Sequence, residues 1–105
     1  MKMSFTDNGY MTRGYSEEIP LVSQLALAMA LKKRVDTHKQ IDYLQVFKLS
    51  RCTDSNGATY QKIVHEQEQP PLKDTYLLLT DEAVEKTVFC IDDGDHYTFL
   101  LAREY

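Results

Sequence analysis

The chain has 105 residues, of which 43% are hydrophobic and 27% charged, and its formal net charge is −4. This length and composition predict one globular domain that is large enough for its own core. The negative total argues against non-specific nucleic-acid binding, and the longest apolar run, residues 25–31, is too short to span a membrane.

The beginning of the chain is polar, and we expect residues 1–9 to form a flexible segment. It contains no apolar stretch of signal-peptide length, so the sequence predicts a cytoplasmic protein. The single folded domain is expected to span residues 10–105, with a short strand within residues 10–14. Cys52 and Cys90 lack metal-site spacing and are expected to be reduced thiols.

Pro20 predicts the start of a long helix, because proline suits the first helical position, and the helix is expected to end near His38. Glu17 and Glu18 would lie at the positive end of its dipole. Apolar residues at helical spacing predict the face that packs on the core: Leu21, Leu25, Ala28, Met29 and Val35, flanked by Val22 and Leu31. The opposite face carries the small side chains of Ser23, Ala26 and Ala30.

Strands are expected over residues 42–52, 59–67, 75–80, 87–91 and 96–102, separated by turns that contain Asn-Gly, Pro-Pro and Asp-Gly. Because the connections are short, neighbouring strands should pair antiparallel as a meander. The predicted fold class is therefore α+β, with one N-terminal helix followed by a five-stranded antiparallel meander. The sheet is expected to be strongly curved or a small open barrel.

Several of these strands are apolar on both faces, as the consecutive residues Leu77, Leu78 and Leu79 illustrate. One helix covers only one face of a sheet, so the other face needs a second cover. Closure of the sheet into a barrel and association with a second subunit both satisfy this requirement.

An acidic tip, made of Asp92, Asp93, Asp95 and His96, surrounds the last predicted turn. If Asp93-Gly94 forms a two-residue hairpin, Asp92 and Asp95 face each other across the ladder, and their like charges need compensation. A divalent metal ion would supply it, because carboxylate oxygens suit Ca²⁺ or Mg²⁺. A solvated turn, with the aspartates bonded to nearby backbone N–H groups, is the other interpretation.

A second candidate cluster is His65, Glu66 and Glu68. In an extended strand, Glu66 and Glu68 point to one side at about 7 Å, a separation used by paired acid–base carboxylates, whereas His65 points to the other side. The alternative interpretation is an exposed charged strand end beside a structural histidine.

A candidate basic patch, Lys32, Lys33 and Arg34, lies near the end of the predicted helix. Together with Lys48 and Arg51 it would offer a surface for nucleic-acid phosphates. Compensation of the helix dipole and ordinary solvation explain the same residues.

Several motifs resemble one family of small bacterial proteins, catalogued as domain of unknown function 960. They are Tyr10–Gly14, Glu18-Ile19-Pro20, Asp42–Phe47, Gln61–Pro71, Ile91–Asp95, Leu100-Leu101 and Glu104-Tyr105. The resemblance implies a stand-alone cytosolic domain and brings no catalytic residue or activity with it.

The function predicted from these observations is a non-enzymatic protein-interaction or regulatory module. Its expected partner is a protein, and a second copy of the same chain is one candidate. Seven tyrosines support this prediction, since tyrosine is enriched at interfaces. No cofactor and no membrane are expected. A nucleic-acid-binding small barrel and a metal-assisted enzyme that uses the acidic tip are the two alternatives.

Overall fold

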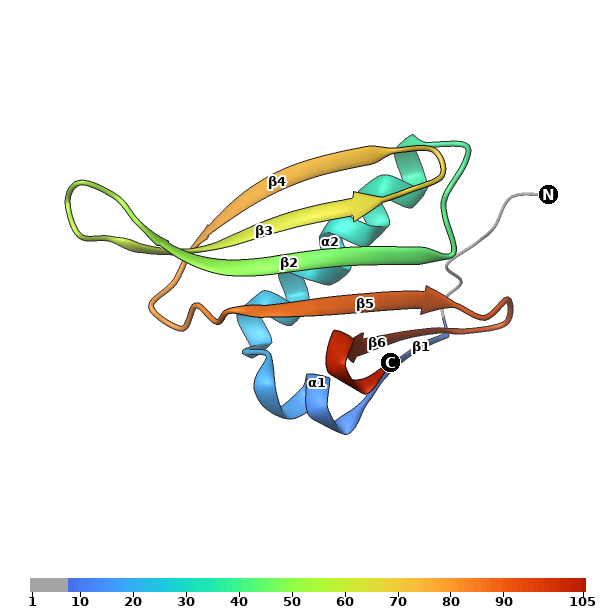
Figure 1. Cartoon of the computed structure of the whole chain (residues 1–105), viewed down its shortest axis with the longest axis horizontal. Coiled ribbons are helices and arrows are strands. Elements are labelled where there is room, and N and C mark those ends of the chain that lie inside the picture. Colours follow the sequence, from blue (N-terminus) through green and yellow to red (C-terminus); the bar gives the residue numbers. More distant parts are fainter. Residues whose placement is uncertain (1–7) are drawn as a thin grey trace.

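The computed structural model describes residues 8–105. Within these residues the chain forms six strands, two α-helices and one 3₁₀ turn (Figure 1). In chain order they are β1 (Gly9–Met11), α1 (Arg13–Glu18), α2 (Leu21–Thr37), β2 (Leu44–Thr53), β3 (Thr59–Gln67), β4 (Leu72–Leu79), β5 (Lys86–Asp92), β6 (Tyr97–Leu101) and η1 (Ala102–Glu104). The predicted α+β class is confirmed, and the long helix lies between Pro20 and His38 as expected.

The strands form one sheet in the order β1-β6-β5-β2-β3-β4. The short β1 runs parallel to β6, and all other neighbours are antiparallel. The predicted simple meander is wrong, because β5 pairs with β2 at the centre of the sheet and not with β4 (Figure 1). The buried Gln61 holds the crossing segment in place, since its side chain accepts from Val84 N at 2.8 Å and donates to Val84 O at 3.0 Å.

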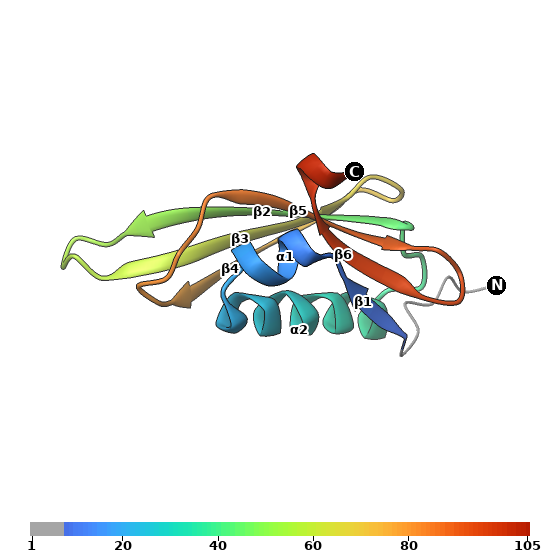
Figure 2. The same ribbon diagram turned by 90° about the horizontal axis from the view of Figure 1, so that it is seen from below.

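The sheet is open, which corrects the expectation of a small barrel: β1 and β4 are separate edges. Both α-helices cover one face of the sheet, and η1 lies on the other face (Figure 2). On this outer face, half-buried residues such as Val46 and Ile91 are interspersed with the exposed Lys48 and Lys62. The expectation that the sheet is apolar on both faces therefore holds only in part, because charged side chains keep part of the outer face in contact with water.

The N-terminal part is more structured than expected. Of the segment expected to be flexible, residues 1–7 lie outside the described part, whereas Gly9 already begins β1. The helix α1 was not predicted; Thr12 caps it by accepting a hydrogen bond from Tyr15 N at 3.2 Å. Glu18 belongs to α1, where it forms ion pairs with Arg103 and Lys86 that tie this helix to the C-terminus and β5.

The orientation of α2 corrects the predicted core face of the helix. The sheet covers Ser23, Leu27, Ala30, Leu31 and Arg34. Most of the predicted apolar stripe points away from the sheet: Leu21, Leu25 and Met29 are 69%, 59% and 73% exposed. Helix and sheet bury a core of aromatic and aliphatic side chains that includes Tyr15, Phe47, Ile63, Val88, Phe99 and Leu101. The small residues Ser23 and Ala30 allow this close approach.

Candidate functional site

The acidic tip is a four-residue loop and not the predicted two-residue turn. Asp92 pairs with Tyr97 across the ladder, so Asp92 and Asp95 do not face each other. Gly94 has a φ of 101°, and its N–H donates to Asp92 Oδ1 at 2.9 Å. This side-chain turn points the Asp92 carboxylate inward and leaves the other two aspartates exposed.

The His96 ring lies within ion-pair distance of two aspartates of the tip. Its Nδ1 lies 2.7 Å from Asp95 Oδ1 and its Nε2 lies 3.2 Å from Asp93 Oδ2. The hydrogen bond with Asp95 is the main cause that raises the pKa of His96. Within residues 8–105, no group of three or more His, Cys, Asp or Glu side chains is arranged to hold a metal ion. The geometry describes a solvated, internally paired turn.

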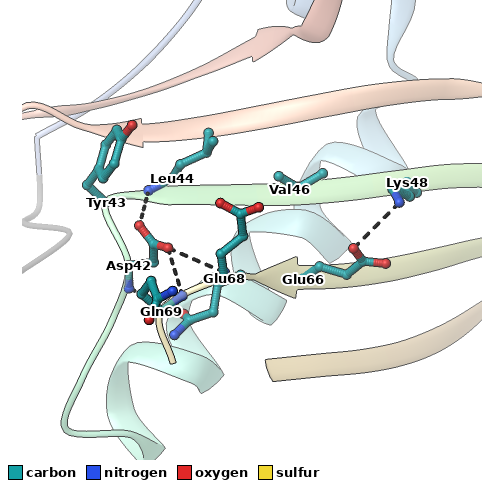
Figure 3. A pocket seen from close by; sticks show the side chains of 9 residues that line it. Asp42, Tyr43, Leu44, Val46, Lys48, Glu66, Glu68 and Gln69 are labelled. Carbon is teal, nitrogen blue, oxygen red and sulfur yellow. Dashed lines mark hydrogen bonds and ion pairs between the residues drawn. The ribbon is translucent and has the colours of Figure 1, made fainter. Parts of the chain in front are cut away.

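The second predicted cluster is divided between the two faces of the sheet. His65 is buried under α2, where its ring stacks on Phe47 at 4.2 Å. Glu66 faces the outer side and lies 3.5 Å from Lys48 Nζ (Figure 3). Because β2 separates β3 from β5 in the sheet, the glutamates and the acidic tip belong to different strand pairs.

Glu66 and Glu68 line an open hollow of about 410 Å³ on the outer face (Figure 3). Its wall is mixed in character, with the aromatic Tyr43, the aliphatic Leu44 and Val46, and the Lys48–Glu66 pair. Asp42 closes one end, since its carboxylate accepts hydrogen bonds from the backbone N–H groups of residues 44, 68 and 69. This role of Asp42 was not predicted, because nothing in the local sequence shows that its side chain bridges the start of β2 and the end of β3.

The predicted basic patch is also divided, because Arg34 is buried. Its guanidinium donates to Asp74 Oδ2 at 2.7 Å, to the backbone oxygen of His65 at 3.0 Å and to Gln45 Oε1 at 3.2 Å. Lys33 lies over the ring of Tyr76 at 5.5 Å. Lys48 lies on the opposite face of the sheet, so the basic residues form no continuous surface in the described part of the chain.

Under α2, Arg34, Gln45, His65 and Asp74 form a connected polar network. Gln45 Oε1 lies 2.7 Å from His65 Nε2, and Gln45 Nε2 donates to Gln67 Oε1 at 2.9 Å. The hydrogen bond from Arg34 lowers the pKa of Asp74, and burial lowers that of His65 to about 3. The network therefore joins α2 to strands β2, β3 and β4 through one buried cation.

The stability of the fold is expected to fall as the pH drops below the ordinary His65 pKa of 6.5. Down to about pH 3, the unfolded chain binds a proton at this position that the folded chain does not. The loss is at most about 1.4 kcal/mol per pH unit. Urea unfolding across this window should show a shallower pH dependence for His65→Gln than for the wild type. Equal slopes of stability against pH for the two proteins would show that His65 makes no contribution to the pH dependence.

The outward face of α2 carries three large, exposed apolar side chains, and we define it as Leu21, Leu25 and Met29. Successive members are four residues apart and therefore form a row along the helix. A hollow lies on each side of the row. One, of about 280 Å³, is lined by Tyr10, Tyr97, Leu21, Leu25 and Ala28 among others; the other, of about 330 Å³, is lined by Met29, Lys33, Tyr76 and Leu78 among others.

Comparison with known proteins shows the family of this chain. The family model described as "Staphylococcal protein of unknown function (DUF960)" matches residues 8–104. The chain belongs to this family. The resemblance inferred from the sequence motifs is thereby confirmed, and the DUF960 family brings no known activity with it. No curated protein matches the chain.

The fold of this DUF960 protein also occurs in a solved structure, a crystal structure of a protein of unknown function from Enterococcus faecalis. The two chains have a TM-score of 0.77 and are 19% identical, over 100% of this chain and 98% of the other. At this identity the likeness concerns the fold alone. In residues 8–105 of the DUF960 chain, no helix combines the length and apolarity that crossing a membrane requires.

Proposed function

We propose that this DUF960 protein is a non-enzymatic protein-interaction module that binds a helix of a partner protein on the outward face of α2. The supporting observation is the exposure of three large apolar side chains in one row on an ordered helix. Soluble proteins seldom leave a continuous apolar surface in water unless it binds something.

The two hollows beside the outward face suit a helical partner. An amphipathic helix that lies along a groove inserts apolar residues spaced three or four apart, and hollows on both sides of the row can receive them. Tyr10, Met29 and Tyr76 contribute to the walls. Tyrosine and methionine are enriched at protein interfaces, where methionine adapts its shape to the partner.

Charge would set the direction of the partner helix. Lys33, at the C-terminal half of α2, is exposed at the rim of the hollow beside Tyr76. An acidic residue at the corresponding end of the partner would pair with it, and such complementarity mainly fixes orientation and association rate.

Site-specific photo-crosslinking in cells of the source bacterium tests this proposal. A benzoylphenylalanine at position 25 or 29 is expected to give a discrete adduct with a partner protein, and Leu21→Glu should abolish that adduct. The same probe at position 53, which is exposed at the far end of β2, is the matched control and should give none. Absence of adducts at positions 25 and 29, or the same adducts at position 53, would refute the proposal.

A further inference from the structure

The strand β4 is the last strand of the sheet and has eight residues, whereas β1 at the other edge has three. The backbone groups of Thr80, directly after β4, point toward β3, because Thr80 N donates to Thr59 O at 3.2 Å. Because alternate residues of an antiparallel strand turn their backbone groups to opposite sides, those of Lys73, Thr75, Leu77 and Leu79 point to the open edge. An edge strand with this many outward backbone groups is a template for another strand.

We propose that β4 pairs antiparallel with β4 of a second copy of this chain, about a two-fold axis at Leu77. This pairing would join the two sheets edge to edge. It goes beyond the proposed function, because it uses the backbone edge of β4 and leaves the row of Leu21, Leu25 and Met29 uncovered; the two proposals share only the hollow that Tyr76 and Leu78 line.

The apolar side chains of β4 favour this arrangement. Leu77 and Leu79 are exposed on the outer face, whereas Tyr76 and Leu78 face α2. Pairing about Leu77 places Tyr76 opposite the partner's Leu78 and Leu79 opposite the partner's Thr75. Each copy therefore extends the apolar wall of the other on both faces of the joined sheet, and aromatic–aliphatic neighbours of this kind stabilise antiparallel pairs.

Charge selects the register. Only side chains on the same face of the joined sheet can lie opposite each other across the seam between the two β4 strands. Lys73 can therefore face only every second residue of the partner strand. When Leu77 lies on the axis, Lys73 faces the partner's Asp81, two residues beyond the end of β4, and the two-fold axis repeats this contact. The nearest alternative registers lack this contact, since centring on Tyr76 would place Lys73 opposite the partner's Leu79, and centring on Leu78 would place Asp81 opposite the partner's Thr75. Both Lys73 and Asp81 are exposed, so both are available to a second copy.

Sedimentation velocity with charge-reversed variants tests the seam. The wild type is expected to sediment as a dimer at twice the chain mass of 12.2 kDa. Lys73→Asp alone and Asp81→Lys alone should each weaken the dimer about tenfold or more, because each creates two like-charge contacts. An equimolar mixture of the two variants should restore dimers, since both contacts then become attractive. A monomeric wild type, or no restoration on mixing, would overturn the proposal.

Cysteine cross-linking provides a second measurement that does not depend on charge. In a Cys52→Ser background, Leu77→Cys places two thiols on the axis, at the Cα separation of about 5.5 Å that a disulfide accepts. Mild oxidation should link this variant into a covalent dimer. Leu79→Cys is the matched control, because its two copies would be about 13 Å apart along the strands and should stay unlinked. Equal linking of both variants would refute the Leu77 axis.

The proposals for β4 and for α2 can fail separately. Lys73→Asp should leave the photo-crosslink at position 25 unchanged, because Leu25 lines the hollow that contains no residue of β4, and Leu21→Glu should leave the dimer intact.

Discussion

Replacing Leu27 by alanine is expected to lower the free energy of unfolding by about 2–5 kcal/mol, whereas Leu25→Ala should change it by less than about 0.5 kcal/mol. The two leucines lie on the same helix, two positions apart, but Leu27 is 0% exposed and Leu25 is 59% exposed. Truncation of Leu27 removes contacts with the sheet and leaves a cavity that the surrounding core fills only in part.

Urea unfolding followed by circular dichroism measures both variants. The pair is a matched comparison, because the two substitutions are chemically identical and both increase helix propensity. If Leu25→Ala were the more damaging change, α2 would have to be rotated so that its predicted apolar stripe packs on the core.

Replacing Asp74 by asparagine should cost about 3 kcal/mol, because it leaves the charge of Arg34 without a counterion. The Arg34 side chain is 1% exposed and cannot recover its lost hydration, whereas Asp74 is 46% exposed, which places the expected cost at the lower end for buried pairs. In Arg34→Met/Asp74→Asn the buried charge is absent, so this double variant should recover part of the loss.

An exposed ion pair on the same helix provides the control. Lys32 and Asp36 lie 2.8 Å apart with both side chains mostly exposed, so Asp36→Asn should change stability by less than about 0.5 kcal/mol. A loss for Asp74→Asn as small as that for Asp36→Asn would show that the buried network contributes little. The destabilisation of Asp74→Asn should also diminish at low pH, where the wild-type carboxylate becomes protonated as the pH falls through its lowered pKa.

The sequence predicted elements well wherever the signal is local. Pro20 marks the start of α2, and turn residues mark the ends of the strands. The sequence does not predict the helix α1, because this helix has only six residues and no apolar periodicity of its own. The crossing from β4 to β5 depends on Gln61 holding Val84, a contact between residues 23 positions apart that no local pattern reveals.

The face of α2 could not be read from its apolar pattern, because both sides of the helix carry large aliphatic residues. Its buried side includes the polar Arg34, whose burial depends on Asp74, 40 positions away in the chain. The predicted two-residue turn at the acidic tip is wrong for a related reason, since the Asp92 side chain accepts a hydrogen bond from the backbone N–H of Gly94 within a longer loop. The outward face of α2 is set by the packing of the helix on the sheet, which no local sequence pattern encodes.

The orientation of α2 is the claim on which the proposed function depends, and native-state thiol labelling tests it most directly. In a Cys52→Ser background, single cysteines at positions 25, 27, 29 and 31 are labelled in purified, folded protein. Cysteines at positions 25 and 29 are predicted to react as fast as an unstructured thiol, and those at positions 27 and 31 only as fast as the protein opens. Protection at positions 25 and 29 with rapid labelling at 27 and 31 would contradict this account.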